Sequence, residues 1–161
     1  MNVKFTSLLS QNRIQAKYIR AIYNKRSEGS QEIIWKSLSD FFPGTTQEIS
    51  LLELAVHAMN PLFATCEILD NPQLKFDDIS LQATKFSSLE EVLSYYDQLI
   101  DRAFDLFSKL DVKTLKGELE DLEEDEVFRR FTVMCFHAAH HFSQMLRLHG
   151  LITEMKTNTT K

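Results

Sequence analysis

The sequence contains little glycine, proline or cysteine. Its 161 residues include four Gly, three Pro and two Cys, too few turn-forming residues for the many short connections of an all-β fold. Cys66 and Cys135 form no CxxC pair, and two cysteines cannot supply the disulfide framework of a small secreted domain. These scarcities favour a helical protein in a reducing environment.

Long apolar runs and an excess of positive charge are also missing. The N-terminal residues MNVKFTSLLSQN are interrupted by polar side chains and lack a signal-peptide core, and no run approaches the ~18 apolar residues of a membrane span. Lys and Arg number 18 against 23 Asp and Glu, a formal charge of −5, which argues against a nucleic-acid-coating surface. We therefore expect a cytoplasmic protein that binds neither membrane nor nucleic acid.

The sequence does contain enough apolar material for one packed core. Hydrophobic residues make up 43% and charged residues 25%, as in ordinary globular domains. Apolar spacing predicts four long helices, over about residues 6–26, from 46 or 50 to 69, over 87–107 and over 126–149. A short amphipathic helix is expected at 31–42. One domain over 1–161 follows, with its core at 6–151 and a polar tail at 152–161.

Local signals place the ends of these helices. Ser87 and Glu90 have capping-box spacing, so the third long helix is expected to begin there. Asn71-Pro72 interrupts the pattern, and residues 70–86 are expected to be a connector. Gly150 stands where a left-handed residue would end the last helix. Four amphipathic helices bury their apolar faces only against one another, so the predicted fold class is an all-α four-helix bundle.

The five histidines are the most informative polar residues. His137 and His141 are four residues apart on the last helix and project from one face, where two imidazoles can bind Zn, Ni, Cu or Fe(II). At 100° per residue both lie at the edge of the apolar face, whereas His140 points outward. His57 lies at the corresponding edge of the second long helix. If the two edges face each other, a metal can bridge the 8–10 Å between packed helices.

Simpler interpretations remain open. HxxxH spacing fixes proximity but not partners, and a lone His57 is often a partly buried, hydrogen-bonded residue. Pro61 has no N–H for the carbonyl of His57, which predicts either a plain kink or break at Asn60-Pro61 or a kink that opens room beside His57. Cys66 and Cys135 fall near apolar arcs and are expected in the core.

Motifs of several other enzyme classes are missing. Ala138 and Ala139 follow His137, so the chain has no HExxH of a zincin protease. It has no ExxH of a di-iron bundle, and no GxSxG, Walker or GxGxxG motif. Beyond a metal, His140 and Glu53 are the candidate general bases.

Three segments resemble the DinB-like (YfiT/DinB) superfamily. They are L-L-E-L-A-V-H-A-M around His57, the capped S-S-L-E-E-V at 87–92, and F-H-A-A-H-H-F-S-Q-M-L-R-L-H-G-L at 136–151. The last looks like the family signature H-x-x-x-H-x-G-Q-x-x-x-x-R-x-x-G, and the order of elements fits over about residues 8–151. Phe142-Ser143 departs from the usual basic-Gly pair. The matching positions are His137, His141, Gln144, Arg147 or its neighbours, and Gly150.

The resemblance implies a bundle with a long crossover connection and His57, His137 and His141 as ligands of one divalent transition metal, such as Zn, Ni, Fe or Mn. Related members are metal-dependent hydrolases or transferases of low-molecular-weight thiols, and many are dimers. We accordingly expect a homodimeric metal-dependent hydrolase or thiol S-transferase, with these three histidines catalytic and a small-molecule substrate. The alternative is a non-catalytic dimeric module that binds a ligand or partner, with any metal bound incidentally.

Overall fold

The computed structural model describes residues 3–23, 34–35, 49–120 and 122–158. Within them, four long helices pack together, as the sequence predicts. They are α1 (Val3–Tyr23), α2 (Leu51–Asp70), α3 (Leu89–Ser108) and α4 (Glu124–Asn158). The short strands β1 (Ile34–Trp35) and β2 (Ile49–Ser50) pair antiparallel before α2.

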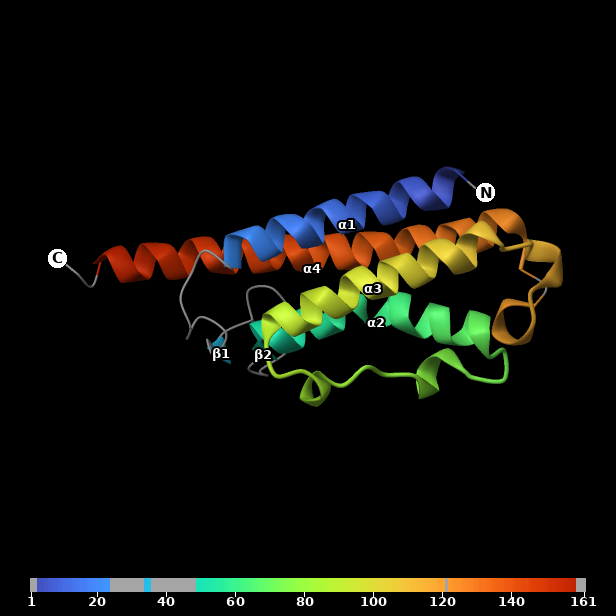
Figure 1. Ribbon diagram of the computed structural model, residues 1–161, viewed down its shortest axis with the longest axis horizontal. Coiled ribbons are helices and arrows are strands. Elements are labelled where there is room, and N and C mark those ends of the chain that lie inside the picture. Colours follow the sequence, from blue (N-terminus) through green and yellow to red (C-terminus); the bar gives the residue numbers. More distant parts are fainter. Residues whose placement is uncertain (1–2, 24–33, 36–48, 121, 159–161) are drawn as a thin grey trace.

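The helices form two parallel pairs that run in opposite directions. Figure 1 shows α1 and α4 running one way and α2 and α3 the other. Each helix packs against two neighbours, so that α1 contacts α3 and α4, and α2 contacts the same two helices. Residues 71–88, which include the 3-10 turns η1 (Phe76–Asp78) and η2 (Ala83–Lys85), return along the bundle from α2 to α3 (Figure 1). This long connection is what makes α2 and α3 parallel.

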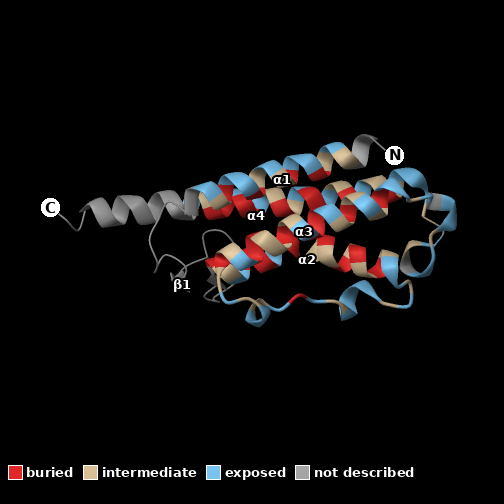
Figure 2. Cartoon of the chain, in the orientation of Figure 1, coloured by how far each residue is buried: buried red, intermediate tan, exposed pale blue. Residues whose placement is uncertain are grey.

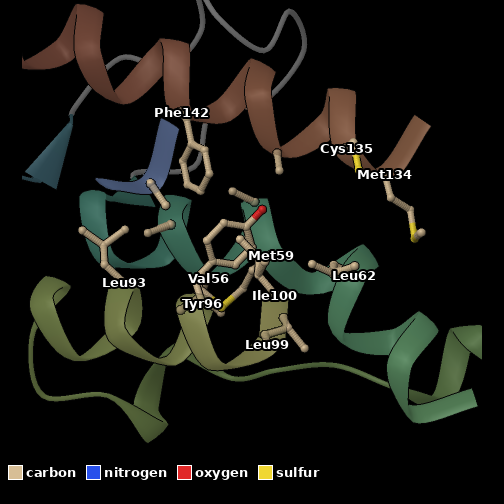
Figure 3. Packing of buried hydrophobic residues seen from close by; sticks show 14 of the residues in the cluster. Val56, Met59, Leu62, Leu93, Tyr96, Leu99, Ile100, Met134, Cys135 and Phe142 are labelled. Atoms are coloured by element: carbon tan, nitrogen blue, oxygen red, sulfur yellow. The ribbon is translucent and has the colours of Figure 1, made fainter. Parts of the chain in front are cut away.

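The core lies on the facing sides of the four helices, where Figure 2 shows the buried residues. Tyr96 rises from α3 and its hydroxyl points toward α4 (Figure 3). Asn12 on α1 donates from Nδ2 to this hydroxyl over 3.0 Å and to the carbonyl of Cys135 over 3.3 Å. The Tyr96 ring meets Phe142 of α4 edge-on, with 5.3 Å between centroids. One buried network therefore fixes α1, α3 and α4 relative to one another.

Two helix ends differ from the predictions. Ser88, rather than Ser87, caps α3, because its Oγ accepts from the N–H of Glu91, whose carboxylate in turn accepts from the N–H of Ser87. α4 continues through Gly150 to residue 158. A single glycine costs a helix only about 1 kcal/mol relative to alanine, and the helix-forming residues that follow continue the turn pattern. The predicted polar tail is therefore largely helical.

The connection between α1 and α2 also departs from expectation. A short helix was predicted at 31–42, but Ile34–Trp35 within this range form β1. The rest of the range, and residues 24–26 of the first predicted helix, lie outside the described residues. α2 runs unbroken past Pro61, so a helix break at that position is wrong. No helix in the described part of the chain combines the length and apolarity needed to cross a membrane.

Candidate metal centre

The structure brings together the three histidines that the sequence singled out. α2 and α4 are antiparallel neighbours, so His57 near the start of α2 lies opposite His137 and His141 in the middle of α4. One potential ligand nitrogen from each ring lies within 4.8 Å of the others. The ring centroids are 4.5 to 4.9 Å apart. His57 is exposed, His137 half-buried and His141 only 2% exposed, so the cluster reaches from the surface into the bundle.

The ring of His141 is held by Gln144, one turn further along α4. His141 Nδ1 lies 2.7 Å from Gln144 Oε1. A carbonyl oxygen only accepts, so Nδ1 carries the proton and the lone pair is on Nε2. Metal-binding histidines commonly have such a partner on the second nitrogen, which fixes tautomer and orientation. The sequence motif contained Gln144, but helical spacing alone did not reveal which histidine it would contact.

His140 stays outside the cluster, as predicted. It is exposed, and its Nε2 lies 3.1 Å from Gln144 Nε2, which donates to it. The amide of Gln144 therefore bridges His140 and His141. His140 also contacts the cluster directly, because its ring meets that of His141 edge-on with 5.1 Å between centroids.

The ring of His137 lies close to the backbone of His57. A hydrogen bond to that backbone raises the pKa of His137, and only an accepting carbonyl stabilises the protonated ring in this way. The carbonyl is available because the residue four positions on is Pro61, which has no N–H. His137 Nε2 is buried with no hydrogen-bond partner. Nε2 is therefore the buried nitrogen of His137 that a ligand would satisfy.

Loss of solvation disfavours the protonated form of all three imidazoles. Loss of solvation lowers the pKa of His57, and it is the largest cause of the lowered pKa of His137 and His141. For His141 the pKa falls to about 4, although the hydrogen bond to Gln144 opposes the change. The neighbouring histidines also lower the pKa of His137 and His141. Neutral imidazole is the form that binds a metal.

These residues fit a divalent transition metal. An unpartnered buried nitrogen costs free energy in the absence of a ligand, and a cation would satisfy His137 Nε2. Two Zn–N bonds of about 2.0–2.1 Å span about 4 Å, a separation that small rotations of the three side chains can reach. Three imidazoles favour Zn, Ni, Cu or Fe over Mg or Ca, and leave at least one coordination position open.

Among the described residues, the cluster contains none of the other candidates considered from the sequence. Cys66 and Cys135 are buried and free, and burial raises the pKa of each thiol to about 12, so both belong to the core as predicted. Glu53 is exposed on α2, one turn before His57. The side chain of His149 lies outside the described residues.

Comparison with models of protein families, with curated proteins and with solved structures finds no match for this chain. The resemblance to the DinB-like superfamily therefore stays a prediction, and function has to be argued from the geometry of the three histidines.

Proposed function

We propose that the protein is a metal-dependent enzyme whose centre is one divalent transition metal held by His57, His137 and His141. The observation that carries this proposal is the cluster itself, with three ligand nitrogens within 4.8 Å. The buried, unpartnered Nε2 of His137 supports it independently. The tautomer that Gln144 sets at His141 supports the same arrangement, because this ring would present Nε2.

Each residue has a distinct part in such a centre. His141 would supply a rigid ligand, since Gln144 orients its ring, and His137 would supply its buried Nε2. His57, the exposed member, would complete the set on the solvent side, where a substrate can approach. When bound, the metal supplies Lewis-acid polarisation of a carbonyl and lowers the pKa of a coordinated water or thiol.

Two reactions are compatible with this site: hydrolysis, and transfer of a low-molecular-weight thiol to an electrophile. The two cysteines of the chain cannot provide the thiol, because burial raises the pKa of Cys66 and Cys135 to about 12 and reactive cysteines need a low pKa. A transferase would therefore require a thiol as second substrate. Hydrolysis needs no second substrate besides water.

Metal uptake by protein purified without a His tag tests the proposal. We expect one divalent ion per chain by elemental analysis, with loss of uptake in His137→Ala. His140→Ala is the matched control, because His140 sits on the same helix but outside the cluster, and it should retain the ion. Absence of uptake from Zn, Ni, Fe and Mn solutions by folded protein would contradict the proposal.

Activity assays on the metal-loaded protein separate the two reactions. Ester or amide cleavage without added thiol indicates a hydrolase. Consumption of an electrophile only when a thiol is present indicates a transferase. Both activities should disappear in His137→Ala and persist in Ser143→Ala, at an exposed position of α4 outside the cluster.

A second candidate function is a dimeric interaction module. Ile14 and Tyr18 on α1 and Phe136 on α4 are exposed by 60% or more, and α1 and α4 are neighbours. Large exposed apolar side chains on adjacent helices favour association. Solution mass by light scattering tests this candidate, with Phe136→Ser expected to weaken a dimer.

A further inference from the structure

A cavity of about 400 Å³ lies beside the histidine cluster, between α2 and α4. It extends from Pro61 and His137 toward the loop between α3 and α4, whose 3-10 turn η4 (Gly117–Leu119) adds one wall. His137 thus belongs both to the cavity wall and to the cluster. The volume is within the range of small-molecule sites. The wall includes Thr65, Leu69, Leu115, Leu119, Phe131 and Met134.

The walls leave few polar groups for a ligand in the body of the cavity. The hydroxyl of Thr65 already donates to the carbonyl of Pro61 over 2.9 Å. Arg129 and Arg130 line the cavity, but both form ion pairs with Glu126. Glu126 balances part of their charge, and the remaining lining is largely apolar. An uncharged apolar ligand body is therefore favoured along this length.

One end of the cavity is different, because His137, which lines it there, is also a member of the histidine cluster. A ligand that fits the whole space needs an apolar tail and a polar head at this end. At about 30 Å³ for each water-sized volume, 400 Å³ corresponds to roughly a dozen non-hydrogen atoms. That is the size of a medium-length acyl chain.

We propose that the substrate of the histidine centre is a medium-chain acyl compound, with its chain in this cavity and its carbonyl head at His57, His137 and His141. The inference rests on the proposed function for the metal that would bind the head. The apolar chain supplies affinity by leaving water, and the three histidines fix which end of the molecule reaches the centre.

A chain-length series of hydroxamic acids tests the inference, because hydroxamates bind divalent metals through two oxygens. The probes are acetohydroxamic, hexanohydroxamic and decanohydroxamic acid, with affinity for zinc-loaded protein measured by calorimetry. Each methylene that enters the cavity should tighten binding by up to about fourfold. The gain should end when the chain fills the cavity. Equal affinity for all three probes overturns the inference and leaves the metal centre intact.

Two matched variants locate the chain. Leu119→Glu places a carboxylate at the loop wall of the cavity, where Leu119 is only half-buried. It should abolish the gain from longer chains while leaving acetohydroxamate affinity unchanged. Ile14→Glu makes the same change at a residue that is 60% exposed on α1, and it should preserve the gain. A chain-length gain that survives Leu119→Glu in folded protein places the chain elsewhere and overturns the inference.

Failure of the metal centre is distinguishable from failure of the cavity. If the protein takes up no metal, the proposed function is wrong. Binding of 1-hexanol and 1-decanol to the metal-free protein then tests whether the cavity accepts an alkyl chain. Tighter binding of the decanol, lost in Leu119→Glu, supports the chain site. Equal binding of both alcohols overturns it.

Discussion

The backbone of His57 lies close enough to the ring of His137 on the opposite helix to raise the pKa of that ring, and Pro61 leaves the carbonyl of His57 without its helical donor. This contact connects three features that are separate in the sequence. The proline removes a backbone donor from α2, the freed carbonyl is able to accept from a ring on α4, and that ring belongs to the cluster. A residue that is unfavourable inside a helix thus helps to position a candidate metal ligand.

Replacing Pro61 with alanine should weaken metal binding without harming α2. Pro61→Ala restores an N–H that competes with His137 for the carbonyl of His57, so the His137 ring loses its fixed orientation. Loss of such a partner typically weakens metal affinity by about 10- to 100-fold. Competition with a zinc chelator measures the change. Pro72→Ala, outside α2, is the control and should bind zinc as the wild type does. If Pro61→Ala also keeps wild-type zinc affinity, the contact has no role in metal binding.

Gln144 should position His141 in the same way. Gln144→Ala leaves Nδ1 of a buried imidazole without its acceptor, and zinc affinity should again fall by about 10- to 100-fold. Gln144→Glu restores an acceptor, so it should recover affinity and raise the pKa of His141, because a carboxylate stabilises the protonated ring. Nitrogen-15 NMR of the imidazole reports both the tautomer and the pKa. Ser143→Ala, at the adjacent exposed position, should change neither the tautomer nor the pKa of His141. If Gln144→Glu fails to raise the pKa of His141, the result is inconsistent with the contact.

The metal-free protein should lose stability as the solution becomes acidic. The pKa of His141 is lowered from 6.5 to about 4 in the folded state, whereas the unfolded chain titrates near 6.5. Between these values the unfolded state binds a proton that the folded state does not, so the free energy of unfolding decreases as the pH falls through this window. Below about pH 4 this contribution levels off.

Urea denaturation across the same pH range measures the effect. His141→Gln removes the titrating ring, so its stability should decrease less steeply than that of the wild type. His140→Gln keeps His141 and should retain the wild-type slope. Identical slopes in the wild type and in His141→Gln would show that His141 does not carry the acid sensitivity.

Gly117 should be required for stability. Its φ is +65°, in the left-handed region where a side chain costs about 1–2 kcal/mol, and a Cβ there would collide with the carbonyl of Pro72. Gly117→Ala should therefore lower the free energy of unfolding by at least about 1–2 kcal/mol in urea denaturation. Gly150→Ala is the opposite case, because Gly150 lies within α4. Gly150→Ala should raise the free energy of unfolding by up to about 1 kcal/mol. If Gly117→Ala leaves the free energy of unfolding unchanged, the loop adjusts to the new side chain.

The sequence by itself determined the number of long helices and the two residues of the centre that share one helix. Helical periodicity is local, so apolar spacing is enough to identify α1 to α4 and to place His137 and His141 on one face. It also assigned Cys66 and Cys135 to the core. Local signals were less reliable at helix ends, where Ser88 rather than Ser87 caps α3 and α4 passes through Gly150.

Only the tertiary structure decided how residues from different helices meet. The antiparallel packing of α2 against α4 brings His57 opposite His137. It also places the ring of His137 near the carbonyl of His57, which Pro61 leaves without a helical donor. The cavity has the same origin, because its walls come from α2, α3, α4 and the connections between them, which are far apart in the chain. Periodicity fixes which face of a helix is buried, but the partner, direction and register of that face depend on packing across the whole core.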